Sequence, residues 1–141
     1  MFSRIYICIG LAALSAAVLC AQQTKLSIQA PRTPPDNGKL MYANYCASCH
    51  GLDGSGHGPT AKVLKFPPPD LTTIAKAHNG VYPAQHVEAV LRFGVDNPAH
   101  GSKEMPVWGP VFQSIDRTGG TPIQALRINN LVRYVKTLQT K

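Results

Sequence analysis

Two cysteines and a histidine stand close together in the first half of the chain, at Cys46, Cys49 and His50. The Cys-x-x-Cys-His spacing is typical of covalent haem attachment. On one helical turn the two thiols can reach the two vinyl groups along one porphyrin edge, and the next residue then directs its imidazole at the iron. The pattern therefore predicts one haem c, attached through Cys46 and Cys49, with His50 as an iron ligand.

Other chemistries compete for the same cysteine pair. A thioredoxin-like redox site would need a β-α-β scaffold, and no run of alternating β-branched residues indicates a strand. A zinc site would need two further ligands, which could come from the histidines outside the motif. These are His57, His78, His86 and His100. A disulfide between the two cysteines would close too small a loop to constrain the chain, and the motif can also arise by chance. Haem attachment is the favoured hypothesis.

The N-terminal segment has the pattern of an export signal. Arg4 precedes an apolar run over residues 5–19, and small residues surround a cleavage point near Ala21. Retention of the run as a short membrane anchor and lipidation at Cys20 remain alternatives. We expect residues 1–21 to be a signal peptide that directs the protein to the periplasm, or a membrane tether if it stays uncut. Cys8 and Cys20 lie inside it, so the mature chain keeps only the pair in the motif.

Length and charge limit the remaining possibilities. A chain of 141 residues fits one domain, which we place at residues 37–141 after a polar, proline-bearing flexible leader over 22–36. The net charge is +7, and removal of residues 1–21 would lower it by one. Because the basic residues form no block, nucleic acid is not expected as a partner. The charge would steer the protein toward an acidic partner or a negative membrane face, or would only maintain solubility.

Caps and apolar periods predict the helices that must position the motif. The first begins at Asp36 or Asn37 and runs to about Cys49. Further helical stretches are expected over 60–65, 71–77, 83–93 and from Pro122 onward. The last is the clearest, with its inward face at Ile123, Leu126, Asn130, Leu131, Tyr134, Val135 and Leu138. Residues 51–60 are a glycine-rich loop without the ending of a phosphate loop, and residues 94–121 are a long loop with at most one short helix.

These elements predict an all-α domain of about four to five helices, with long loops wrapped around one covalent haem. The helices alone would bury too little apolar surface for stability, and a large apolar ligand beneath the loops would supply the rest.

The function depends on the second axial ligand of the iron. Met105 is the favoured candidate, because it lies in an aperiodic loop where Pro106 restricts the neighbouring backbone. Met1 lies in the signal, and Met41 belongs to the packed face of the first helix. The four histidines outside the motif are rivals, and an open iron is the third possibility. A thioether would favour Fe(II), raise the reduction potential and leave electron transfer as the remaining activity.

The chain resembles a class I monohaem cytochrome c of the bacterial type over roughly residues 37–140. The matching residues are Gly38, Tyr42 and the haem motif, then Gly58-Pro59, Met105-Pro106, Leu131 and Tyr134. The resemblance implies that Gly38 lets the first and last helices cross closely, with the two tyrosines and Leu131 at the crossing. It also implies that the Pro59 carbonyl accepts the ring N–H of His50. The early position of the motif differs from that in the gas-binding helical bundles.

Other residues are weaker site candidates. Trp108 could donate its indole N–H to a haem propionate or pack over the ring, and Arg92, Lys62 and Lys65 could bind propionates or a docking partner. No acid–base pair for catalysis is apparent. We expect a monomeric electron carrier that serves redox protein partners with acidic docking surfaces and has no enzymatic activity. The alternatives are a haem subunit of a larger oxidoreductase and an open-site gas-binding protein.

Overall fold

The fold is described from a computed structural model, over residues 30–94, 105–116 and 120–140. Within those ranges every regular element is a helix, which confirms the predicted all-α class. The α-helices are α1 (Gly38–Tyr45), α2 (Ala47–His50), α3 (Ile74–Ala77), α4 (Ala84–Phe93), α5 (Trp108–Ile115) and α6 (Gly120–Thr137). Two 3-10 helices, η1 (Ala61–Val63) and η2 (Leu71–Thr73), lie between α2 and α3. None of the described helices is both long and apolar enough to cross a membrane.

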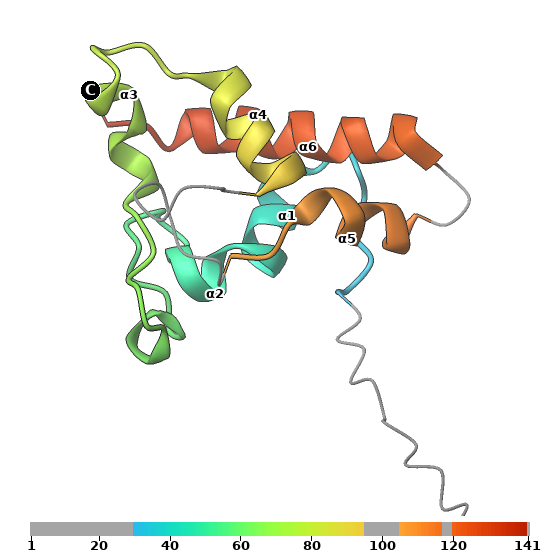
Figure 1. The fold of residues 1–141 in the computed structure, drawn as a ribbon, viewed down its shortest axis with the longest axis horizontal. Helices are drawn as coiled ribbons and strands as arrows, with labels where there is room; N and C mark the ends of the chain where they lie inside the picture. The colour runs from blue at the N-terminus through green and yellow to red at the C-terminus, as the bar shows by residue number, and fades with distance from the viewer. Residues whose placement is uncertain (1–29, 95–104, 117–119, 141) are drawn as a thin grey trace, which may run out of the picture.

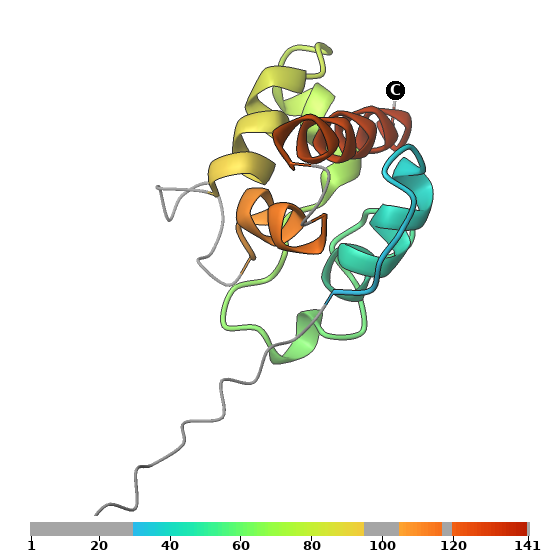
Figure 2. The same cartoon turned by 90° about the vertical axis from the view of Figure 1, so that its right-hand side faces the viewer.

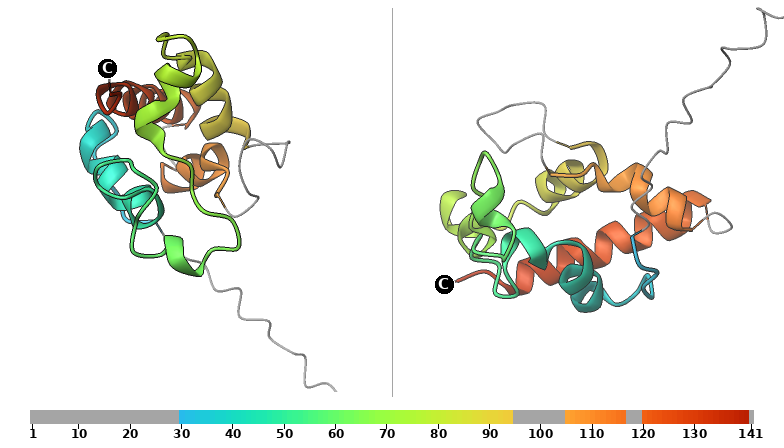
Figure 3. Two further views of the ribbon diagram at one scale, coloured as in Figure 1. Left: turned by 90° about the vertical axis from the view of Figure 1, so that its left-hand side faces the viewer. Right: turned by 90° about the horizontal axis from the view of Figure 1, so that it is seen from below.

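The longest helix, α6, is the centre of the domain. It contacts α1 on one side and α4 and α5 on the other, and α4 also contacts α5 (Figure 2). The residues most completely buried between these helices are Met41, Tyr42, Phe112, Ile128 and Leu131. Residues 51–70 leave this group of helices and arc away from it before the chain returns at α3 (Figure 3). The fold therefore consists of a helical core with one long excursion that begins directly after the haem motif.

The crossing of α1 and α6 has the composition that the resemblance implied. A Cβ atom on Gly38 would collide with the backbone carbonyl of Asn130, so only glycine permits this approach. Next to it the rings of Tyr42 and Tyr134 lie with centroids 5.1 Å apart, and Leu131 is almost fully buried. The contact joins the helix that leads to the motif with the C-terminal helix.

The first predicted helix is divided in the structure. The Asn37 side chain caps α1 by accepting the Leu40 N–H at 2.9 Å, as expected. The helix ends at Cys46, and α2 then forms a separate single turn over the rest of the motif. The predicted inward face of α6 is also partly wrong, because Leu126 is 41% exposed whereas Arg127 is buried. Because the residue at position 127 is charged, a pattern of apolar residues does not identify the face of α6 that is buried.

Part of the segment before α1 packs against the helices. The sequence predicts a flexible leader up to residue 36, but Thr33 is buried and hydrogen-bonded to Tyr45 at 2.7 Å. The Asn130 side chain also donates to the Pro35 carbonyl at 3.1 Å. The last part of the predicted leader is therefore docked on α1 and α6, and the earlier residues of that leader lie outside the described ranges.

Candidate haem site

The haem motif occupies one short helix and the residue before it. Cys46 caps the N-terminal end of α2, and Cys49 and His50 belong to its only turn. Cys46 and Cys49 form no disulfide and are half-buried, while His50 is buried. The three side chains that the motif predicts to work together are thus presented within one turn. Two thiols and an imidazole in this arrangement are the donor set that covalent haem attachment needs.

The glycine-rich loop after the motif fixes the C-terminal end of this turn. The backbone carbonyls of residues 48, 49 and 50 have no partners within so short a helix. They accept from the N–H groups of Thr60, Gly58 and Gly56 at 2.9, 3.0 and 2.8 Å. A Cβ on Gly58 would lie 2.6 Å from the Ala47 carbonyl oxygen, so this close approach also requires glycine. The loop therefore holds the motif rigidly without a long helix.

The orientation of His50 differs from the expectation in one respect. Its ring atom Nδ1 lies 3.3 Å from the backbone carbonyl of Pro69. The resemblance had implied Pro59, and that assignment is wrong, because the loop carries the exposed Pro59 past α2 and returns a later proline to the ring. A carbonyl at Nδ1 receives the ring N–H and leaves Nε2 for a metal. Three consecutive prolines occupy residues 67–69, and nothing in their sequence distinguishes Pro69 from the other two.

The ionisation of the motif does not fit thiol redox chemistry. Burial, followed by the neighbouring Cys49, raises the pKa of the Cys46 thiol to about 12. Catalytic thiols of the thioredoxin type have a lowered pKa instead. Burial also lowers the pKa of His50, against the smaller opposing effect of the Pro69 carbonyl, so the imidazole is neutral at pH 7. A neutral imidazole is the form that binds a metal.

Met105 lies three residues before α5, and Trp108 is the first residue of that helix. Met105 is half-buried against the hydrophobic core, just before α5 begins. Trp108 is buried, and its ring centroid is 5.4 Å from that of Tyr45, the residue before Cys46. Trp108 also stacks on Phe112. The structure thus brings Trp108 to the end of α1, and its ring packs on aromatic neighbours.

The histidines that competed for the iron lie elsewhere. His57 and His78 are exposed, with Nδ1 near the Ser55 hydroxyl and the Ile74 carbonyl respectively. His86 is exposed on α4 beside His78, with ring centroids 6.3 Å apart, and His100 lies outside the described ranges. No group of three or more His, Cys, Asp or Glu side chains in the described parts could hold a metal ion. This does not support the zinc alternative.

Two of the three basic candidates have local partners. Arg92 forms an ion pair with Glu88 one turn earlier on α4, at 2.8 Å. The Lys65 ammonium lies 5.4 Å from the centre of the Phe66 ring, and Lys62 is exposed on η1. None of these contacts points to propionate binding. The lysines remain candidates for docking.

The comparisons with known proteins agree with this geometry. A family model described as Cytochrome c matches residues 35–139. No curated protein and no solved structure matches the chain. The family match includes the divided helix with the motif, the long excursion and the helix crossing at Gly38. The chain therefore belongs to the cytochrome c family, and it carries a single haem c attached covalently through Cys46 and Cys49 for electron transfer.

Proposed function

We propose that the protein is an exported electron carrier whose haem iron is held by His50 on one side and Met105 on the other. The haem supplies one-electron chemistry, because its iron alternates between Fe(III) and Fe(II). His50 is buried, neutral and oriented by the Pro69 carbonyl, so its Nε2 is available as a ligand. A thioether opposite it would favour Fe(II) and suit an acceptor late in a respiratory chain.

The placement of Met105 carries this proposal. Of the methionines in the described ranges, Met41 is fully buried in the core near Arg127, whereas Met105 is only half-buried at the start of α5. Its neighbour Trp108 contacts Tyr45, which directly precedes Cys46. Met105 therefore lies three residues before a side chain that contacts the residue next to the attachment turn, which supports it as the second ligand.

Substitution of Met105 tests the ligand assignment. In oxidised holoprotein the weak sulfur-to-iron absorption band should be lost in Met105→Ala and retained in His100→Ala. Reduced Met105→Ala should also bind carbon monoxide readily, because the sixth position would be open, whereas wild-type protein should not. A band that survives in Met105→Ala would overturn the assignment. Ready carbon monoxide binding by the wild-type protein would favour the gas-binding alternative.

The surface near Cys49 favours a protein partner with acidic groups. The Cys49 thiol lies 3.1 Å from the Thr60 hydroxyl, which places the second attachment point beside η1. The residues that follow include the exposed apolar side chains Val63 and Phe66, next to Lys62 and Lys65. Exposed apolar side chains next to two lysines fit a transient, salt-sensitive contact with an acidic redox protein.

The carrier and the oxidoreductase subunit make different predictions about assembly. A diffusing carrier should elute from a native extract as a small monomer, whereas a subunit should elute with its complex. Export is the other part of the proposal, because residues 1–21 have the pattern of a signal peptide. The mass of the mature protein should then correspond to a chain that begins after residue 21 and carries one haem.

A further inference from the structure

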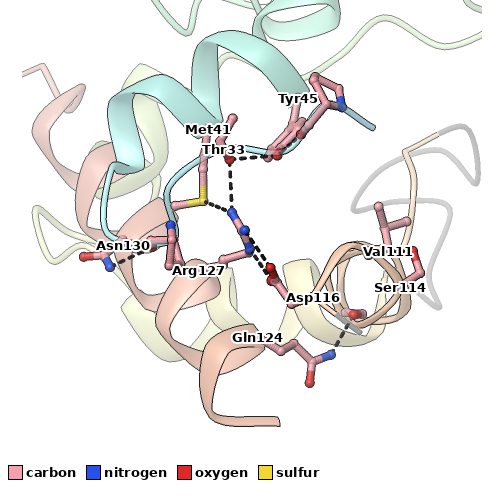
Figure 4. Close-up of polar contacts among 12 residues, drawn as sticks. Thr33, Met41, Tyr45, Val111, Ser114, Asp116, Gln124, Arg127 and Asn130 are labelled. Atoms are coloured by element: carbon pink, nitrogen blue, oxygen red, sulfur yellow. Dashed lines mark hydrogen bonds and ion pairs between the residues drawn. The ribbon is translucent and has the colours of Figure 1, made fainter. Parts of the chain in front are cut away.

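Arg127 is a buried cation that neither haem attachment nor the proposed ligation requires. It lies on α6, and only 2% of its surface is exposed. Figure 4 shows its guanidinium among side chains from α1, α5 and the segment before α1. Arginine is almost never buried without a partner. The contacts around it therefore indicate what it does.

The main partner of Arg127 is Asp116, at the C-terminal end of α5. The two nitrogen atoms Nε and Nη2 donate to the two carboxylate oxygens at 2.5 and 2.9 Å (Figure 4). A bidentate pair of this kind fixes both the distance and the relative orientation of its two groups. The pair therefore ties the end of α5 to α6 in one orientation. A second tie lies close by, because the Gln124 side chain donates to the Gly109 carbonyl at 2.6 Å.

The remaining donor of Arg127 reaches the other side of the core. Its Nη1 donates to the Thr33 hydroxyl at 3.0 Å and lies 3.5 Å from the Met41 sulfur. The Thr33 hydroxyl is in turn 2.7 Å from the Tyr45 hydroxyl. Since Tyr45 directly precedes Cys46, the network runs from Asp116 on α5 to the residue before the first haem attachment point. We call these four residues, Thr33, Tyr45, Asp116 and Arg127, the clamp.

The clamp and an aromatic cluster together hold α5 at both ends. At the N-terminal end, Trp108 and Phe112 contact Tyr45, with ring centroids 5.4 and 5.6 Å apart from it. At the C-terminal end, Asp116 is held by Arg127. A rotation or shift of α5 would break one set of contacts or the other. It would also shift the chain leading into α5, where Met105 lies three residues before the first helical residue.

A buried ion pair is a poor device for stability alone. Apolar side chains of similar size commonly give equal or greater stability, because an ion pair loses its hydration on burial. An apolar pair, however, lacks the directional constraint of two parallel hydrogen bonds. The ion pair between Arg127 and Asp116 therefore contributes a fixed orientation of α5.

We propose that Arg127 is a positioning residue, which acts through Asp116 and the clamp to fix α5 and so hold Met105 at the iron. This inference rests on the proposed Met105 ligation. Arg127 itself does not touch the iron or its ligands. Its effect is on how large a fraction of the molecules has the thioether in place.

The test replaces the ion pair by apolar residues of similar size and measures ligation in the folded holoprotein. In Arg127→Met/Asp116→Leu, the sulfur-to-iron band should weaken, the reduction potential should fall, and the affinity of oxidised protein for external imidazole should rise at least about tenfold, since imidazole competes with Met105. Arg133→Met, an exposed arginine on the same helix, is the matched control. It should match the wild-type protein in all three measurements.

Each outcome bears on the inference. If the double variant is folded and its band, potential and imidazole affinity equal those of the wild-type protein, Arg127 is only structural and the inference is wrong. If the double variant does not fold, Asp116→Asn decides instead, because it keeps the shape of the side chain and loses one acceptor. Wild-type imidazole affinity in folded Asp116→Asn would equally overturn the inference. Met105→Ala, measured in the same series, reports separately on the ligation itself.

Discussion

Asp116 is the residue whose ionisation should be visible in the stability of the domain. The hydrogen bonds and charge of Arg127 lower the pKa of this carboxyl below its ordinary value of 3.8, against the opposing effect of burial. The same contact raises the pKa of Arg127. A carboxyl with a lowered pKa in the folded state adds stability above its unfolded-state pKa, and this contribution is lost as the pH falls through the folded-state pKa.

Loss of the Asp116 charge should therefore destabilise the protein at neutral pH. At pH 7, Asp116→Asn should lower the free energy of unfolding by about 3 kcal/mol, because Arg127 keeps its buried charge without a countercharge. The difference between variant and wild type should shrink as the pH falls below about 4. Urea unfolding of both holoproteins across this range measures it. Asp36→Asn, at an exposed carboxyl, should show no such pattern, and a constant difference for Asp116→Asn would contradict the argument.

Single residues differed in how well the sequence identified them. Spacing predicts Cys46, Cys49 and His50, because covalent attachment demands fixed positions along the chain, and the family match supports attachment through the two cysteines. The carbonyl that orients His50 was misassigned, because Pro59 and Pro69 both lie in proline-containing loops and only the three-dimensional path of the loop distinguishes them. Arg127 looked like one more surface charge, since its burial depends on partners from three other segments.

Among the elements, the contact of α1 with α6 depends on the smallest side chain in it. Gly38 lies against the backbone of Asn130 and the Cβ of Tyr134, the latter only 3.1 Å from where its own Cβ would be. The backbone of Asn130 cannot shift to make room for a Cβ atom, as the end of a flexible side chain could. A methyl group at residue 38 therefore has to push the two helices apart.

We expect Gly38→Ala to destabilise the holoprotein by about 2 kcal/mol, as overpacking of a close helix contact does. The gain in helix propensity from alanine offsets only part of this cost. The midpoint of denaturant unfolding measures the loss. Lys39→Ala, on the next and exposed position of the same helix, should change stability by less than about 0.5 kcal/mol. An unchanged midpoint in Gly38→Ala would mean that the helices do not approach this closely.

The helices were predicted most reliably where a cap or a terminal glycine marked them. Asn37 begins α1, and Gly94 ends α4 with a φ of 81°. The helix α5 falls within residues 94–121, for which the sequence predicts a long loop with at most one short helix, because Gly109 and Pro110 suggest irregular structure. Both lie in the first turn, where backbone N–H groups have no partner within the helix and proline therefore costs little. No residue type in the sequence marks the point where α1 ends and α2 begins.

At the scale of the whole molecule, the position of the charges matters more than their sum. Lys62 and Lys65 flank the exposed Val63 on the excursion beside Cys49, whereas Lys76 and Lys136 lie on α3 and α6. All four lysines are exposed. Val63 is 83% exposed, the largest exposure among the big apolar side chains described. The proposed electron-transfer contact should therefore depend on the first pair of lysines and not on the second.

Charge reversal separates a local docking surface from a general effect of net charge. Lys62→Glu/Lys65→Glu should slow electron transfer to an acidic redox protein by about tenfold or more at low ionic strength, because steering raises association rates by such factors. Lys76→Glu/Lys136→Glu changes the net charge equally and should slow the reaction much less. Stopped-flow oxidation of the reduced holoproteins measures both rates. The difference between the two double variants should vanish at high salt, because dissolved ions then screen the attraction between the lysines and the acidic partner. Equal slowing in both would place the effect in the net charge of the molecule and would remove the docking surface from the proposal.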